Sequence, residues 1–122
     1  MGKQKRIEDE LCYAVTDALY KLEAVGWLTF AKYHPEGRRS PQYGLKMKRM
    51  GVRAGFPDYW IGLSNGKTVF IELKKATGTL SPAQKIWHAI VDLLGYAVFV
   101  VKTDSPNEAV KMVLEIIMEA RK

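Results

Sequence analysis

The stretch PDYWIGLSNGKTVFIELK, residues 57–74, decides the fold because it predicts two short strands joined by a tight turn. In the predicted strands, 58–63 and 68–74, every odd position holds a large apolar side chain. Successive side chains of a strand point to opposite faces, so the odd positions predict one continuous buried face. Asp58, Glu72 and Lys74 then belong to the other face.

The register of this hairpin follows from keeping both apolar sets on one face. A two-residue turn at 65–66 would pair position 63 with 68 and mix the faces, whereas a three-residue loop at 64–66 pairs 63 with 67. The second register places Asp58 opposite Glu72, with Lys74 next along the same face. Facing carboxylates repel unless a cation lies between them. A divalent metal such as Mg²⁺ is one explanation; neutralisation by Lys74 alone is the other.

The segments before and after the hairpin predict the remaining elements. Apolar residues spaced by three and four, from Ile7 to Val25, predict a helix over 5–25 that ends at Gly26. Alternation over 27–33 predicts a first strand. The segment 35–56 predicts a long loop with one helical turn near 45–50.

Two capping signals mark the later helices. Ser81-Pro82-Ala83-Gln84 predicts a helix start, and Gly95 its end. The side of that helix expected to be buried carries Ile86, Trp87, Ile90, Val91 and Leu94. The unbroken apolar run 96–101 predicts a strand buried on both faces. A last helix follows Ser105, with its inward side made by Ala109, Val113, Ile116, Ile117 and Ala120.

Composition limits the class of protein. The 122 residues are one domain's length, and 48% apolar residues exclude disorder for most of the chain. One cysteine, Cys12, and two histidines exclude an internal disulfide and a cysteine-rich or multi-histidine metal site, so a metal would need carboxylates. The absence of a long apolar run or a leader-like start predicts a cytoplasmic protein with no membrane span.

The charge balance favours a polyanionic partner. Lys and Arg number 19 against 13 Asp and Glu, which gives a net charge of +6. Between positions 37 and 55 there is no acidic residue, and the basic ones are Arg38, Arg39, Lys46, Lys48, Arg49 and Arg53. This segment predicts a loop that contacts nucleic-acid phosphates. The alternative is a loop whose charges only keep it solvated.

The motif spacing resembles a known nuclease superfamily. Pro57-Asp58 followed by Glu72-Leu73-Lys74 resembles the PD-(D/E)XK nucleases, and segments 51–58, 71–75 and 78–84 resemble their VRR-NUC branch. The resemblance covers nearly the whole chain and implies one nuclease domain over 1–122, of the stand-alone form found in phages and bacteria. It implies an α/β fold with a restriction-endonuclease-like αβββαβ core, a mixed central sheet flanked by helices, and an added C-terminal helix.

The resemblance also implies roles for individual residues. Asp58 and Glu72 match the family's metal-binding carboxylates, and the backbone carbonyl of Leu73 would complete the protein ligands of Mg²⁺ or Mn²⁺. Lys74 matches the lysine that positions and polarises the attacking water.

Two further matches have competing explanations. Glu8 matches an acidic residue that reaches the metal directly or through water, but a favourable charge near a helix start is the alternative, and Glu10 is a rival for the match. Gln84 matches a glutamine beside the active site, but it is also the expected capping-box partner of Ser81.

The implied activity is metal-dependent hydrolysis of DNA phosphodiester bonds. Resemblance to Holliday-junction resolvases implies branched DNA as substrate and a homodimer, for which the last helix, Trp27 or Trp87 are candidate surfaces. The competing interpretation is a catalytically silent, basic nucleic-acid-binding module.

Overall fold

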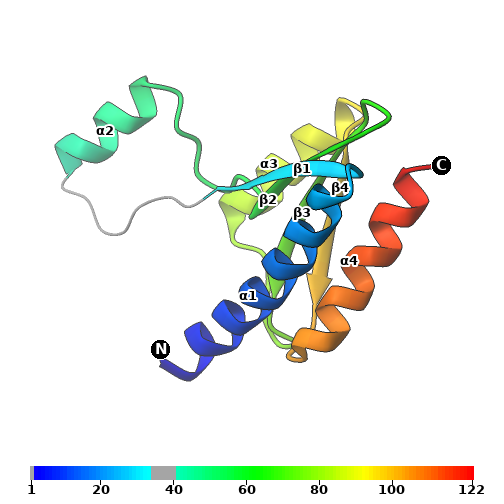
Figure 1. Ribbon diagram of the computed structural model, residues 1–122. Helices are drawn as coiled ribbons and strands as arrows, with labels where there is room; N and C mark the ends of the chain where they lie inside the picture. Colours follow the sequence, from blue (N-terminus) through cyan, green and yellow to red (C-terminus); the bar gives the residue numbers. More distant parts are fainter. Residues whose placement is uncertain (1, 34–40) are drawn as a thin grey trace.

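The computed structural model describes residues 2–33 and 41–122 (Figure 1). One four-stranded sheet has the order β1 (Leu28–Lys32), β2 (Tyr59–Leu63), β3 (Thr68–Lys74) and β4 (Ala97–Lys102). The first three strands are antiparallel neighbours, and β4 runs parallel to β3. The predicted α/β class with a mixed sheet is confirmed.

Helices cover the two faces of this sheet unequally. The long α1 (Gly2–Ala24) and α4 (Pro106–Ala120) pack against each other and against one face. On the other face, α3 (Pro82–Leu93) lies against β4, and its Trp87 ring contacts the Phe70 ring of β3. A short helix, α2 (Pro41–Arg49), stands away from the sheet (Figure 1). Within the described ranges, no helix is long and apolar enough to cross a membrane.

The main core lies between the sheet and the α1–α4 pair. The odd-numbered hairpin residues predicted to share a buried face do so, with at most 5% exposure: Tyr59, Ile61, Leu63, Val69, Ile71 and Leu73. Leu11, Val15 and Leu19 of α1 and Val113 and Ile117 of α4 are fully buried against them. Each such side chain contributes roughly 1.5–3 kcal/mol through burial, so this face fixes the hairpin in place.

The hairpin has the predicted register. Tyr59 pairs with Ile71 and Gly62 with Thr68, and the Leu63 N–H donates to the Lys67 carbonyl at 2.9 Å. The third loop residue, Gly66, has φ +83°, which glycine adopts without a steric penalty. Continuing the same pairing by one residue sets Asp58 opposite Glu72.

The α3 and β4 predictions need correction, because much of this side of the molecule is exposed. β4 is an edge strand rather than one buried on both faces: only Val101 is buried, while Phe99 and Val100 are 40% and 38% exposed. In α3 only Val91 is buried. The other predicted inward residues include three that are exposed, namely Ile86 at 62%, Ile90 at 40% and Leu94 at 69%. Apolar residues occupy more of the α3 circumference than its contact with the sheet covers.

Two smaller differences concern helix ends. Val25 lies beyond the end of α1 and is 66% exposed, so the buried stripe is shorter than predicted. The expected helical turn in the basic segment is a nine-residue helix, α2. Of that segment, Arg38 and Arg39 lie outside the described residues.

A glycine brings the loop before β2 against the start of α3. Gly55 has φ +85°, and a Cβ on it would collide with the backbone carbonyl of Ala83. Only glycine allows this close approach of two backbones. The contact places the Asp58 end of the hairpin beside the first turn of α3, where Gln84 lies.

Candidate active site

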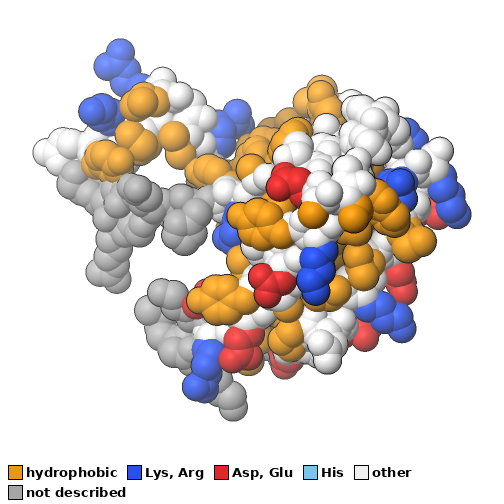
Figure 2. All heavy atoms as spheres, viewed as in Figure 1, with side chains coloured by type: hydrophobic (Ala, Val, Ile, Leu, Met, Phe, Trp, Pro, Cys, Tyr) orange, Lys and Arg blue, Asp and Glu red, His pale blue; other side chains and the backbone are white. Residues whose placement is uncertain are grey.

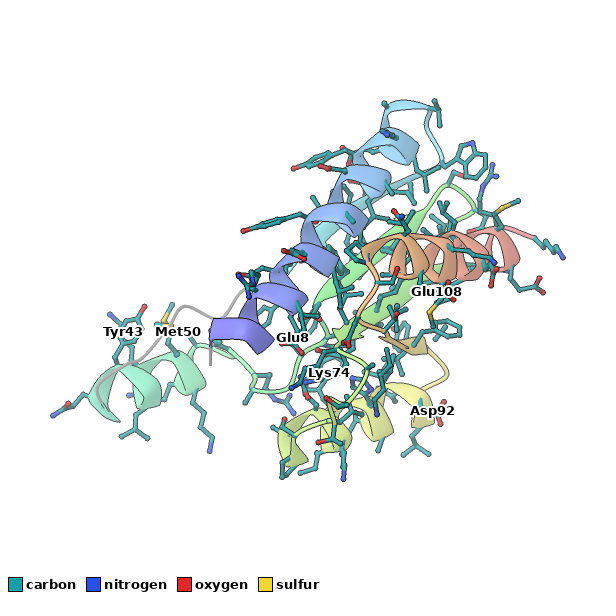
Figure 3. The ribbon with its side chains drawn as sticks, turned by 90° about the horizontal axis from the view of Figure 1, so that it is seen from below. Glu8, Tyr43, Met50, Lys74, Asp92 and Glu108 are labelled. Atoms are coloured by element: carbon teal, nitrogen blue, oxygen red, sulfur yellow. The ribbon has the colours of Figure 1, made fainter. Side chains whose placement is uncertain are left out.

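A polar cleft of about 230 Å³ lies at the open end of the hairpin, between α1 and the start of α3. All five predicted site side chains line it. Figure 3 shows Glu8 of α1 and Lys74 of β3 at this end of the sheet. The full lining is Glu8, Asp9, Cys12, Lys32, Asp58, Glu72, Leu73, Lys74 and Gln84.

Asp58 is held from both of its neighbouring strands. Its backbone carbonyl accepts the Tyr33 N–H at 2.8 Å, which continues the β1–β2 pairing. Its Oδ2 accepts the Leu73 N–H at 2.7 Å, so the carboxylate reaches across to the end of β3. The half-buried carboxylate is therefore fixed in position by a backbone group of β3.

Glu72 is the one buried charged residue among those described, with 2% exposure. Its Oε2 accepts from Gln84 Nε2 at 3.1 Å, while its Oε1 is buried and has no hydrogen-bond partner in the described part of the chain. Burial raises the pKa of Glu72 to about 9, helped by the negative charge of Asp58 and opposed by Lys74 and Lys32. A cation bound nearby would have the opposite effect and favour the ionised form.

Gln84 makes the capping contacts with Ser81 and also contacts the Glu72 carboxyl. Its Oε1 accepts the Ser81 N–H at 2.8 Å, and its own N–H donates to Ser81 Oγ at 3.2 Å, which forms the capping box. Its Nε2 remains available and donates to Glu72. The helix cap therefore orients the amide that holds the buried carboxyl.

Of the two acidic rivals on α1, Glu8 lines the cleft and Glu10 is exposed. Glu8 Oε2 accepts the Lys75 N–H at 3.5 Å, directly after the end of β3. Below it, the Tyr59 hydroxyl is 2.7 Å from Thr16 Oγ1 and donates to the Cys12 carbonyl at 3.2 Å. These bonds fix α1 over the hairpin and so fix the approach of Glu8.

The side chains present fit a hard divalent cation. Asp58 and Glu72 provide two oxygen-donor groups from adjacent strands, and Glu72 Oε1 is unpartnered among the described residues. No set of three or more His, Cys, Asp and Glu side chains suited to a metal occurs within residues 2–33 and 41–122. A site with two carboxylates suits Mg²⁺, which retains several waters and takes few protein ligands.

Two solved structures resemble this chain over nearly its full length. One, named "VRR_NUC domain", has a TM-score of 0.54 and 25% identity, covering 95% of this chain and 95% of its own. The other, named "VRR_NUC domain protein", has a TM-score of 0.62 and 26% identity, covering 91% of this chain and 88% of its own. The chain is thus similar in fold and in sequence to solved VRR-NUC domains over about nine-tenths of its length. Searches with protein-family models and against curated proteins found no match.

Two side chains near this cleft were not predicted from the sequence. Lys32 of β1 lines the cleft and opposes the raised pKa of Glu72. His88 of α3 lies with its Nε2 3.8 Å from Glu72 Oε1, and burial together with the charge of Lys74 lowers the pKa of His88. The one feature of the sequence that could have indicated His88 is its four-residue spacing from Gln84, which puts both side chains on one helix face.

The basic residues of segment 37–55 that the structure describes do not line the acidic cleft. Lys46, Lys48 and Arg49 are exposed in the last turn of α2, and Arg53 is exposed in the segment after it. Figure 2 shows Lys and Arg side chains on this projecting part of the molecule. The Arg53 carbonyl accepts the Tyr33 hydroxyl at 3.3 Å, which ties that segment to the end of β1.

Proposed function

We propose that this nuclease-family domain, spanning residues 1–122, is a metal-dependent deoxyribonuclease. The observation that carries the proposal is the cleft that brings together the Asp58 carboxylate, the buried Glu72 carboxyl and Lys74; burial and the charge of Asp58 also raise the pKa of Glu72 to about 9. A structural ion pair would keep the carboxyl ionised without a metal. A buried acid that carries a proton instead is suited to exchange that proton for a divalent cation.

Mg²⁺ or Mn²⁺ would be held by Asp58, Glu72 and the Leu73 carbonyl, with Glu8 contributing directly or through water. When bound, the ion supplies Lewis-acid stabilisation of a phosphate oxygen and acidifies a water molecule. The backbone N–H of Leu73 keeps Asp58 in place, and Gln84 keeps Glu72 in place. Both carboxylates are thus oriented before substrate arrives.

Lys74 acts on the reacting groups in this proposal. Its side chain lines the cleft on the same face as Glu72, from the last residue of β3. There its ammonium group orients the attacking water and offsets negative charge as it develops on the phosphate. Attack in line with the leaving oxygen then breaks the phosphodiester bond.

The basic segment would hold the DNA backbone. Lys46, Lys48, Arg49 and Arg53 are exposed on and beside the projecting α2, where they can reach phosphates on either side of the cut. The predicted phosphate contacts also include Arg38 and Arg39, which lie outside the described residues. Phosphate contacts of this kind position a duplex without reading its bases, so binding weakens with salt.

We also propose that the substrate is branched DNA and that the domain acts as a homodimer. Exposed apolar residues of α3, of the turn after it and of β4 support a second copy as the partner, because β4 is an edge strand that pairs only with β3 among the described strands: Ile86, Leu93, Leu94, Tyr96, Phe99 and Val100. Two cuts in opposite strands need two sites in fixed relation, which twofold symmetry provides. Of the other candidate residues for this surface, Trp87 packs on Phe56 and Trp27 packs under Arg121.

The test is a cleavage panel of linear, flapped, splayed and four-way DNA with Mg²⁺, Mn²⁺ or EDTA. We expect metal-dependent cutting, strongest on the four-way junction, and loss of cutting in Asp58→Asn. Asp17→Asn, the same change at an exposed position of α1, is the matched control. Absence of metal-dependent cleavage on every substrate would contradict the proposal, and retained binding would then favour a silent DNA-binding module.

A further inference from the structure

Two buried polar atoms face each other beside the cleft without a hydrogen bond. Glu72 Oε1 and His88 Nε2 are 3.8 Å apart, and neither has a hydrogen-bond partner among the described residues. Their side chains are 3% and 11% exposed, so water does not readily replace the missing partner. Each such buried polar group left unsatisfied costs about 1–3 kcal/mol.

The geometry makes each of these atoms the natural partner of the other. A hydrogen bond between a ring N–H and a carboxylate oxygen has a length of about 2.7–3.2 Å, so closure needs a movement of less than about 1 Å. A neutral imidazole can carry its single hydrogen on Nε2 and thus act as a donor. An ionised Glu72 would accept it.

Gln84 makes the corresponding contact on the other carboxyl oxygen. Gln84 and His88 are one helical turn apart in α3, and Gln84 Nε2 donates to Glu72 Oε2 at 3.1 Å. The capping box at Ser81 fixes Gln84, and the Phe56 and Phe70 rings fix the neighbouring Trp87. One rigid helix face therefore presents two side chains to the two oxygens of one carboxyl.

We propose that His88 is a positioning residue that donates its Nε2–H to Glu72 Oε1 when this carboxyl binds a divalent cation. The inference rests on the proposed function, because Glu72 is a metal ligand in that function. His88 would be the second side chain, after Gln84, that holds the Glu72 carboxylate in place. Supports of this kind orient a ligand, and their loss typically lowers metal affinity by 10–100-fold. His88 itself touches neither metal nor DNA in this assignment.

The first test measures Mn²⁺ affinity from the electron paramagnetic resonance signal of free Mn²⁺. His88→Leu keeps the bulk and removes the donor, and we expect it to weaken Mn²⁺ binding on the order of 10–100-fold. His88→Gln restores an N–H donor, so it should bind Mn²⁺ more tightly than His88→Leu. If His88 has only a packing role, both variants that fold will bind Mn²⁺ as the parent does, and the inference fails.

A second test needs no variant at position 88. The chain has two histidines, so ¹⁵N-histidine spectra of the Mg²⁺-saturated protein contain two ring systems, and a His34 variant assigns them. We expect the His88 hydrogen on Nε2. A hydrogen on Nδ1 alone would overturn the inference, because Nε2 could then not donate.

The two proposals fail in different ways. If the parent binds no Mn²⁺, or if Asp58→Asn binds it equally well, the proposed metal site itself is wrong. If the parent binds Mn²⁺ and Asp58→Asn does not, while His88→Leu matches the parent, only the role of His88 is wrong.

Discussion

Replacing Glu72 by glutamine should stabilise the metal-free protein while abolishing cleavage. Glu72 is 2% exposed, and its pKa is about 9 in the fold against 4.5 for a free side chain. Between these two values the native state keeps a proton that the unfolded chain has released. The free energy of unfolding therefore falls as pH rises from 4.5 towards 9.

The size of this penalty follows from the pKa difference. At about pH 7.5, some three units above 4.5, the penalty is about 4 kcal/mol at about 1.4 kcal/mol per unit. Glutamine is neutral at every pH, and its carbonyl can still accept from Gln84. We therefore expect Glu72→Gln to unfold at a higher urea concentration than the parent in EDTA. Its free energy of unfolding should exceed that of the parent by up to the same penalty.

The assay is urea unfolding at several pH values, with and without Mn²⁺. In EDTA the parent should lose stability from pH 5 to pH 8 more steeply than Glu72→Gln, and Mn²⁺ should stabilise only the parent. Glu10→Gln, the same change at an exposed position of α1, should follow the parent. Equal pH profiles for the parent and Glu72→Gln would refute the reasoning, because Glu72 would then not hold its proton in the fold.

Three other changes test separate parts of the molecule. Lys74→Ala should remove turnover but keep most of the Mn²⁺ affinity; a cleavage rate close to the parent's would exclude its role in positioning water. Arg49→Ala should weaken DNA binding and lower the slope of log K against log salt by about one, whereas Lys111→Ala on α4 should leave it unchanged. An unaltered slope for Arg49→Ala would remove α2 from the interface. Leu93→Asp should halve the native mass measured by light scattering, because Leu93 is 86% exposed on the proposed dimer surface; a monomeric parent would contradict the dimer.

The hairpin shows how much of this site follows from sequence. Parity of the apolar residues fixed its register, and the register alone set Asp58 opposite Glu72. The Ser81–Gln84 capping signature fixed the start of α3, which placed Gln84 against Glu72. The register and the helix start depend only on short-range patterns, whereas the position of Gln84 beside the site was implied by the resemblance to the VRR-NUC family.

The missed features depend on long-range packing. An apolar run such as 96–101 can form either a central strand or an edge strand, so the exposure of β4 could not be deduced from the sequence of this run. Lys32 enters the cleft only through the pairing of β1 with β2, which no local pattern specifies. The proximity of His88 to Glu72 depends on how α3 packs against the sheet, which the sequence does not specify.

The location of bound Mn²⁺ tests the central claim most directly. Anomalous scattering from a crystal of the protein grown with Mn²⁺ should show a peak within bonding distance of the Asp58 and Glu72 carboxylates and none there in Glu72→Gln. A crystal saturated with Mn²⁺ that shows no peak between these two side chains would contradict the account.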